Sequence, residues 1–135
     1  MPSKKPIFKK PREVIKKYEE STWLGNDKPF FEDKHVAVFK DKYPVTPGHL
    51  LFIPKVNDIK TISKAYSLAY YCGQEWMKSG SIDGYNIGQN LGEAAGQTIM
   101  WPHIHFIPRK NGDVDPDKHN GIRLSFPKGD HTNYY

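Results

Sequence analysis

The sequence predicts an α+β fold, in which five antiparallel strands form one sheet and a single long helix crosses a face of it. Two observations support this prediction. Short apolar segments, bounded by Pro, Gly, Asn and Asp, lie on both sides of one helical stretch at residues 58 to 78. Strands interrupted by one helix are typical of a sheet covered on one face. The 135 residues, with 37% hydrophobic and 26% charged side chains, suit one soluble domain.

The N-terminal segment is expected to start as a basic, disordered arm over residues 1 to 10 and to continue as a short helix. Pro11 suits the first turn of that helix, and Gly25 with Asn26 lies beyond its end. Seven of the 20 basic residues precede residue 18, and only Glu13 opposes them there. Such an arm either attracts nucleic acid through its phosphates or simply keeps the protein soluble.

Three strands are expected before the long helix, at residues 29 to 33, 35 to 41 and 49 to 54. The connector between the second and the third, residues 43 to 48, contains two prolines and a glycine, which cannot continue a ladder of hydrogen bonds. This connector predicts a hairpin-like reversal of the chain. The second and third strands should therefore pair antiparallel.

The long helix is predicted by apolar residues at steps of three and four, which form one stripe over residues 58 to 78. Asn57 or Asp58 can cap its start, and Gly80 can end it. Cys72 and Trp76 lie on the stripe and are interpreted as packing residues. A fourth strand is expected at residues 85 to 90, and a fifth contains His103 and His105.

The domain is expected to span residues 11 to 115, followed by an irregular tail over residues 116 to 135 that is rich in polar and turn residues. No apolar segment approaches the roughly 20 residues that cross a bilayer, and the N-terminus lacks a secretory signal. Cys72 is the only cysteine, which excludes an internal disulfide and fits a reducing compartment. These features predict a cytoplasmic protein that does not bind membranes.

The sequence His103-Ile104-His105 contains the residues best suited to chemistry. In a strand, alternate side chains share a face, so His103 and His105 point to the same side as Trp101. An imidazole can be a nucleophile, a proton carrier or a metal ligand near neutral pH. Two histidines satisfied within a core, or a zinc or copper site formed with His49, are the alternatives to a nucleophilic role.

A loop of small residues over positions 91 to 98 precedes this histidine pair. Glycines allow its backbone N–H groups to approach an anion closely, and the loop places Gln97 and Thr98 within a few residues of His103. Hydrogen-bond donors beside a nucleophile are suited to stabilising charge on a phosphate or acyl oxygen. The loop is not a triphosphatase phosphate loop, because no Gly-Lys-Ser or Gly-Lys-Thr follows it.

These segments together resemble the histidine triad (HIT) superfamily of nucleotide hydrolases and transferases. The resemblance runs from about Phe30 to Asp115 and rests on residues 96 to 108, on residues 47 to 54 and on Gly112-Asp113-Val114. It implies a HIT-like fold and cleavage at the α-phosphate of dinucleoside polyphosphates or nucleoside phosphoramidates. By position, His103 matches the nucleophile that forms a nucleotidyl-histidine, His105 the last histidine of the triad, and His49 an earlier histidine that supports the site.

The resemblance also implies how a nucleotide is bound. Asp41 matches a group that contacts ribose hydroxyls, Asn90 a polar contact near the sugar, Phe39 part of the base pocket, and Gln97 and Thr98 donors to phosphate. It implies a homodimer and no resident metal or other cofactor, with a divalent cation arriving only with substrate phosphates. Alternatives are a module that binds a nucleotide without turnover, and an enzyme acting on nucleic-acid ends through the basic arm.

The sequence departs from the family pattern at Trp101, where the first histidine of the triad is expected. An indole offers one N–H donor and no acceptor nitrogen, so it cannot replace an imidazole. The Trp101 carbonyl is still present, and Pro102 favours an extended conformation at Trp101 that would orient it toward His103. We expect catalysis with altered specificity, in which Trp101 stacks on a base or fills a pocket.

Overall fold

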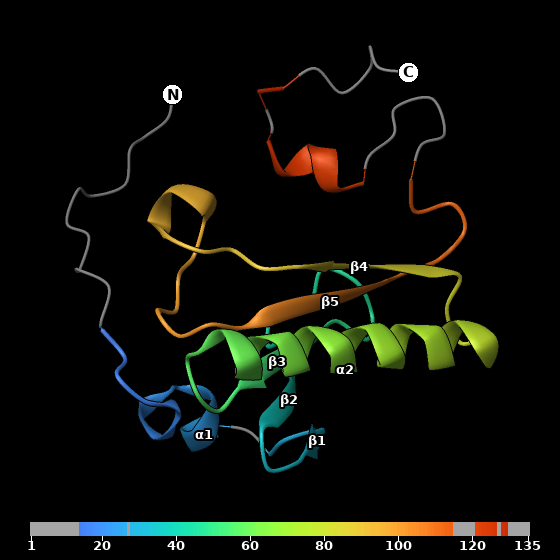
Figure 1. Ribbon diagram of the computed structural model, residues 1–135. Helices are drawn as coiled ribbons and strands as arrows, with labels where there is room; N and C mark the ends of the chain where they lie inside the picture. The colour runs from blue at the N-terminus through green and yellow to red at the C-terminus, as the bar shows by residue number, and fades with distance from the viewer. Residues whose placement is uncertain (1–13, 27, 115–120, 127, 130–135) are drawn as a thin grey trace.

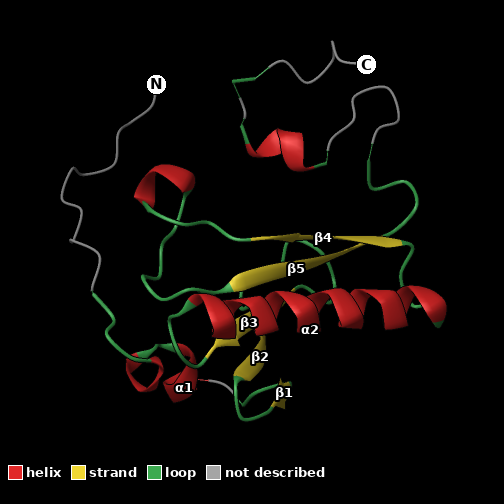
Figure 2. Ribbon diagram, in the orientation of Figure 1, coloured by secondary structure: helices red, strands yellow, loops and turns green. Residues whose placement is uncertain are grey.

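Five antiparallel strands and one long helix form the body of the protein in the computed structural model, which describes residues 14–26, 28–114, 121–126 and 128–129. The strands pair in the order β1-β2-β3-β5-β4. Their bounds are Phe31–Glu32 (β1), Val36–Lys40 (β2), Leu50–Pro54 (β3), Gly84–Gly88 (β4) and Ile104–Arg109 (β5). The helix α2, Ile59–Lys78, lies across one face of the sheet (Figures 1 and 2), which confirms the predicted α+β fold.

The central strands β2 and β3 are covered on both faces. On one face, side chains such as Val38 and Phe52 pack against α2. On the opposite face, Phe39 and Ile53 pack with aromatic side chains from the N-terminal segment and with Trp101. Alternate residues therefore belong to two different cores, because successive side chains of a strand point to opposite faces. The predicted antiparallel pairing of these two strands is confirmed by their register, in which Val38 lies opposite Phe52.

The helix α2 begins and ends where its capping residues predict. The Asp58 side chain accepts a hydrogen bond from the Thr61 N–H at 2.8 Å, which is an N-cap interaction. Gly80 follows the last turn with a φ of 83°, a left-handed conformation that glycine adopts without strain. Cys72 and Trp76 pack against the core between α2 and the sheet, as predicted.

The prediction of a short helix that starts at Pro11 is wrong for residues 14–26, the part of this segment that the structure describes. Val14 forms an isolated bridge with Met100, Tyr18–Glu20 forms only a 3-10 turn, and the helix α1 comes later, at Trp23–Asn26. Tyr18 and Trp23 are buried against the sheet. A helix of about ten residues is marginal by itself, so the burial of these two aromatic rings decides the path of the chain.

Two further predictions concern segments outside the described residues. The basic arm over residues 1 to 10 lies there, and so do the predicted domain boundaries at residues 11 and 115. In the described part of the C-terminal tail, Ile122–Ser125 forms the 3-10 turn η3, which lies over the sheet face opposite α2 (Figure 1). Among the described residues no helix has both the length and the apolar character needed to cross a membrane.

Gly73 in α2 provides a test of this packing. A Cβ built on Gly73 would lie 2.3 Å from the ring of Tyr85, whose phenol also packs against Tyr70 and Phe106. Alanine is the better helix former by about 1 kcal/mol, but the contact requires the ring to move, and overpacking typically costs about 1–3 kcal/mol. We expect Gly73→Ala to lower the free energy of unfolding, measured by urea denaturation. A gain in stability would show that the Tyr85 ring does not constrain the helix.

Candidate active site

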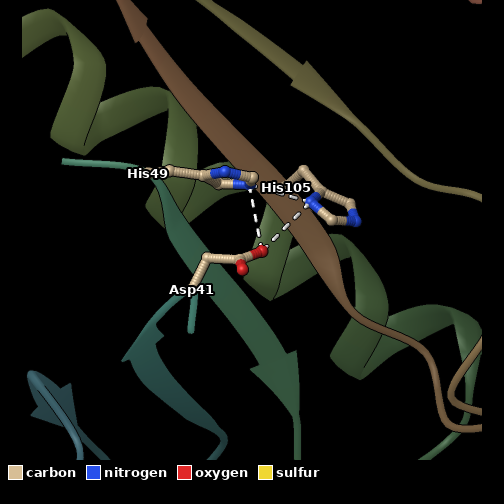
Figure 3. A group of neighbouring side chains, drawn as sticks. All are labelled: Asp41, His49 and His105. Atoms are coloured by element: carbon tan, nitrogen blue, oxygen red, sulfur yellow. Dashed lines mark hydrogen bonds and ion pairs between the residues drawn. The ribbon is translucent and has the colours of Figure 1, made fainter. Parts of the chain in front are cut away.

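One carboxylate and two of the predicted histidines come together at the ends of three strands, on the face of the sheet opposite α2. Asp41 directly follows β2, His49 directly precedes β3, and His105 lies in β5, where it is near the carboxylate and the imidazole (Figure 3). The pairing of β3 with β5 places Leu51 opposite His105. His49 lies two residues before Leu51 and so projects from the same face. Residues 56 positions apart in the sequence thereby come within hydrogen-bond distance.

The tautomer of His103 is fixed by one hydrogen bond. Its Nδ1 lies 2.7 Å from the carbonyl oxygen of Trp101, and both groups are buried. A carbonyl oxygen only accepts, so Nδ1 carries the proton and donates. The Nε2 of the neutral imidazole therefore keeps its lone pair. The sequence-based expectation that the Trp101 backbone holds His103 is confirmed.

A second chain of hydrogen bonds fixes the other two imidazoles. The Val45 N–H donates to Nδ1 of His49 at 3.1 Å, so Nε2 of a neutral His49 carries the proton. That nitrogen lies 2.9 Å from Nδ1 of His105 and 3.3 Å from the Asp41 carboxylate. Nδ1 of His105 consequently accepts a hydrogen bond, which leaves its own proton on Nε2. The site thus holds a lone pair on His103 and an N–H donor on His105.

The second carboxylate oxygen of Asp41 accepts a hydrogen bond from the Tyr43 N–H at 2.7 Å, which stabilises the turn before Pro44. Asp41 therefore stabilises this turn and still presents a carboxylate oxygen to the site. One oxygen orients the turn and the other faces the imidazoles, at 3.3 Å from His49 and 3.9 Å from His105. A carboxylate has about four lone-pair positions, so Asp41 retains acceptor capacity for a ligand hydroxyl.

Burial keeps the imidazoles neutral. It lowers the pKa of His103, although the hydrogen bond to the Trp101 carbonyl and the charge of Asp41 act in the opposite direction. It likewise lowers the pKa of His49, against the effect of Asp41. The pKa of His105 falls to about 4, first through burial and then through repulsion from His103 and His49. At pH 7 the nucleophilic form of His103 is therefore the populated one.

The histidines open into a cavity of about 520 Å³, which is within the size range of small-molecule sites. His49, His103 and His105 line it, together with Asp41. Its wall also contains aromatic, apolar and basic side chains from other elements, namely Trp23, Lys40, Lys42, Tyr43, Val45, Leu51 and Ile99. The cavity therefore combines an apolar wall, two lysines and a nucleophilic nitrogen.

Three of the six predicted nucleotide-binding residues, Asp41, Asn90 and Thr98, line this cavity, and three do not. Asn90 and Thr98 are exposed on its wall, next to Gly96. Gln97 is buried instead, and its side chain stabilises the loop by accepting from the Gly92 N–H and donating to the Ile99 carbonyl. Phe39 is fully buried in the core beneath the cavity. The direct contacts with a nucleotide that were predicted for these two residues are therefore wrong. The Gln97 side chain is bonded within the loop, and the Phe39 side chain is packed in the core, so both support the cavity from outside it.

Trp101 does not make the predicted contact with a ligand either. Only 3% of its surface is exposed, and its Nε1–H donates to the Pro54 carbonyl at 2.9 Å. The indole packs with Phe39 and Ile53 in the core on this face of the sheet. Trp101 thus fills the interior beside β3, where a smaller imidazole would leave space, and does not line the cavity.

Trp23 is the cavity residue that the sequence analysis missed. Its ring centroid lies 5.1 Å from that of His103, and only 8% of the residue is exposed. Trp23 belongs to α1, which is 80 residues away from His103 in the sequence. No local pattern indicates this contact, since it depends on the path of the N-terminal segment across the sheet.

Asp41, His49 and His105 are the described residues whose donor atoms could hold a metal ion. One donor atom from each lies within 4.8 Å of the others. Imidazole nitrogens with one carboxylate oxygen are a ligand set that suits zinc. Three histidines, His49, His103 and His105, are the ligands expected from the sequence, but the structure groups only His49 and His105 with the Asp41 carboxylate.

Comparisons with known proteins agree with this geometry. The family model described as the HIT domain matches residues 25–112. An uncharacterized HIT-like protein of Methanocaldococcus jannaschii is 34% identical over 110 residues, which cover 71% of this chain and 79% of that protein. An asymmetrical bis(5'-nucleosyl)-tetraphosphatase of Schizosaccharomyces pombe is 33% identical over 91 residues, covering 62% of this chain and 50% of the relative.

A solved structure gives the same result for the fold. The diadenosine triphosphate hydrolase of Plasmodium falciparum superposes with a TM-score of 0.61 at 25% identity, over 84% of this chain and 79% of that one. The fold is thus shared with a protein that is named a diadenosine triphosphate hydrolase.

The buried imidazoles predict that stability falls in mild acid. In the unfolded chain a histidine titrates near its ordinary pKa of 6.5, whereas the folded chain holds the pKa of His105 at about 4. Between these values the unfolded chain binds more protons, so the free energy of unfolding decreases as the pH falls. We expect the midpoint of urea unfolding to decrease from pH 7 to pH 5, and to decrease less in His105→Asn.

The exposed Tyr71 on α2 offers a control for this measurement. Tyr71→Phe removes no histidine and should show the same dependence on pH as the unaltered chain. A His105→Asn variant with an unchanged pH dependence would contradict the lowered pKa of His105.

Proposed function

The chain belongs to the HIT domain family, and from this premise we propose that it is a nucleotide hydrolase acting at the α-phosphate of nucleoside phosphate conjugates. The substrates are dinucleoside polyphosphates or nucleoside phosphoramidates, and the intermediate is a nucleotidyl-histidine. One observation carries the proposal. The Nε2 lone pair of His103 faces a cavity, because its Nδ1–H donates to the Trp101 carbonyl.

In the first step, Nε2 of His103 attacks the α-phosphorus. A bond forms between Nε2 and phosphorus, and the bond from phosphorus to the leaving group breaks with its electron pair on the leaving group. Because the Trp101 carbonyl already orients the ring, the imidazole needs little reorientation before attack. The same carbonyl stabilises the positive charge that develops on the ring as the new bond forms.

His105 acts on the phosphate oxygens and the leaving group. Its Nδ1 accepts from His49, so its Nε2–H is the donor available to a bound ligand. A donor at this position stabilises negative charge that accumulates on oxygen in the transition state. The Asp41 carboxylate, at 3.3 Å from Nε2 of the neutral His49, keeps the arrangement of donors fixed.

The rest of the nucleotide is bound by the wall of the cavity. We assign the ribose hydroxyls to the remaining acceptor positions of Asp41, and the phosphate oxygens to Thr98 and Lys42. Asn90 contacts the sugar or the phosphate. Trp23, Leu51 and Ile99 supply the apolar surface for the base, the role that the sequence analysis gave to Phe39.

In the second step, a water molecule attacks the phosphorus of the nucleotidyl-histidine. The bond between phosphorus and Nε2 breaks and its electron pair returns to His103, while the water loses a proton to the solvent and its oxygen leaves as part of the nucleoside monophosphate. These residues supply nucleophile, donor and charge compensation between them. We therefore propose that the chemistry requires no resident metal, and that a divalent cation accompanies only the substrate phosphates.

We also propose that two copies of the chain form a homodimer along β4. Among the described residues this strand is an edge of the sheet, so half of its backbone hydrogen-bonding groups have no strand partner within that part of the chain. Next to it, α2 exposes aromatic side chains, including Tyr70 at 59% and Tyr71 at 62%. Tyrosine supplies large contact area at low entropic cost, which suits an interface.

His103→Ala is the central test of the hydrolase proposal. Without Nε2 no nucleotidyl-histidine can form, so we expect release of AMP from diadenosine tetraphosphate and from adenosine phosphoramidate to fall by a factor on the order of 10⁴. The reaction is followed by chromatography in EDTA and in Mg²⁺. Mass spectrometry of the unaltered protein, quenched during turnover, should find the added nucleotide on His103.

His35→Ala is the matched control, because His35 does not line the cavity that His49, His103 and His105 line. It should keep its activity on both substrates. Nucleotide binding in calorimetry without turnover of either substrate would support a binding module and contradict the hydrolase proposal.

The dimer is tested by the mass of the protein in solution. Light scattering should give about 31 kDa, twice the 15.6 kDa of one chain. A buried lysine in a tyrosine interface loses its hydration without a partner, so Tyr70→Lys should lower the mass toward that of a monomer. Val56→Lys, in the exposed turn after β3, should not. A monomeric unaltered chain would refute the proposed dimer.

A further inference from the structure

The 41–49 loop, residues 41 to 49 between β2 and β3, holds His49 in the site. Its two ends are joined by the Asp41 N–H, which donates to the His49 carbonyl at 3.0 Å. Within the loop, the His49 N–H donates to the Thr46 carbonyl at 3.2 Å, and the Val45 N–H donates to Nδ1 of the His49 ring at 3.1 Å. The backbone of this loop therefore binds the ring, and the placement of the loop decides the placement of the Val45 N–H.

Thr46 attaches the 41–49 loop to β5. Its hydroxyl donates to the Pro108 carbonyl at 3.0 Å, a contact between residues 62 positions apart in the sequence. The next carbonyl of β5, that of Arg109, accepts from the Asp83 N–H on the side of β4. Successive carbonyls of a strand point to opposite edges, so the Pro108 carbonyl points toward β3. Because β3 begins only at Leu50, the Thr46 hydroxyl takes the place of a strand partner.

Packing alone does not orient this loop. Gly48 lies against β5, since a Cβ on it would be 3.2 Å from Cγ of Pro108, and its φ is 87°. Apolar contact is non-directional, whereas a hydrogen bond is lost when its donor turns away. The Val45 side chain is 67% exposed, so its own packing constrains the Val45 N–H little. The hydrogen bond from Thr46 is thus the directional contact that fixes the loop next to Val45.

The Val45 N–H selects one of two proton arrangements in the pair of rings. With Nδ1 of His49 accepting this N–H, the proton of His49 lies on Nε2 and is donated to His105, whose own proton then lies on Nε2. Without it, both protons can lie on Nδ1, and His105 then presents a lone pair to the ligand. The Asp41 carboxylate lies 3.3 Å from one shared nitrogen and 3.9 Å from the other (Figure 3), so it discriminates between the arrangements less than Val45 does.

We propose that Thr46 is a positioning residue for the reaction. Its hydrogen bond to Pro108 keeps the Val45 N–H on the ring of His49. The N–H donor of His105 is thereby directed at the ligand, where a lone pair would repel phosphate oxygens. Thr46 does not line the active-site cavity, so it acts only through the loop. The effect on turnover rests on the proposed function, whereas the effect on the proton positions does not.

Nitrogen NMR tests the proton positions directly. In proton–nitrogen correlation spectra of protein with isotope-labelled histidine, at pH 7 and in EDTA, protonated and unprotonated ring nitrogens have different shifts. We expect His49 and His105 to carry their protons on Nε2 in the unaltered chain. Thr46→Val replaces the hydroxyl with a methyl group and should move both protons toward Nδ1, whereas Thr46→Ser keeps the hydroxyl and should not. His103, held by the Trp101 carbonyl, is the internal reference.

Turnover measures the consequence for catalysis. A donor that acts on charge in the transition state contributes to kcat more than to substrate binding. Thr46→Val should lower kcat for diadenosine tetraphosphate by about 10- to 100-fold, as is typical of residues that orient a catalytic side chain, and leave KM within about twofold. Thr46→Ser should keep both values within about twofold. Thr61→Val makes the same change at a buried position in α2 and is the control for a general loss of stability.

The outcomes separate the two proposals. Turnover of neither diadenosine tetraphosphate nor adenosine phosphoramidate by the unaltered chain would overturn the proposed function, and the NMR spectra would still decide the role of Thr46. Unchanged proton positions in Thr46→Val would overturn that role, and so would moved protons with an unchanged kcat. An equal loss of kcat in Thr46→Val, Thr46→Ser and Thr61→Val would overturn it as a general effect on stability. If circular dichroism shows Thr46→Val unfolded, Thr46→Ala, which also lacks the donor, carries the same expectations.

Discussion

The register between β3 and β5 is the constraint on which the site depends. It places Leu51 opposite His105, and so brings His49 within 2.9 Å of His105. A slip of one residue would turn His105 toward α2 and turn Phe106 outward. Burial of the strands on both faces opposes such a slip, because apolar side chains from each face pack into a separate core. The packing that stabilises the sheet therefore also aligns the imidazoles.

Each histidine in the site has a defined proton position because one of its nitrogens is bound to a backbone group or to another ring. The Trp101 carbonyl and the Val45 N–H are the two backbone groups, and they fix His103 and His49 respectively. The backbone thus assigns the lone pair and the N–H donors without a further charged residue. Asp41 contributes its charge at the edge of this arrangement and stabilises the turn before Pro44 with its other oxygen.

Trp101 shows how a residue can leave the triad pattern while its backbone keeps its place in the site. The indole packs in the core and bonds the Pro54 carbonyl, whereas the Trp101 carbonyl still accepts from His103. The hydrogen bond that orients His103 is made by the backbone of residue 101 and is independent of its side chain.

The sequence by itself determined the strands after residue 30, the helix α2 with its Asp58 cap, and the position of both histidines on one face, because these follow from local periodicity and capping chemistry. It also predicted the carbonyl that holds His103. Only the tertiary structure decided the path of the N-terminal segment, the burial of Gln97 and Phe39, and the place of Trp23 beside His103. These depend on contacts between distant segments, where burial of aromatic surface outweighs the weak preference of a short segment for helix.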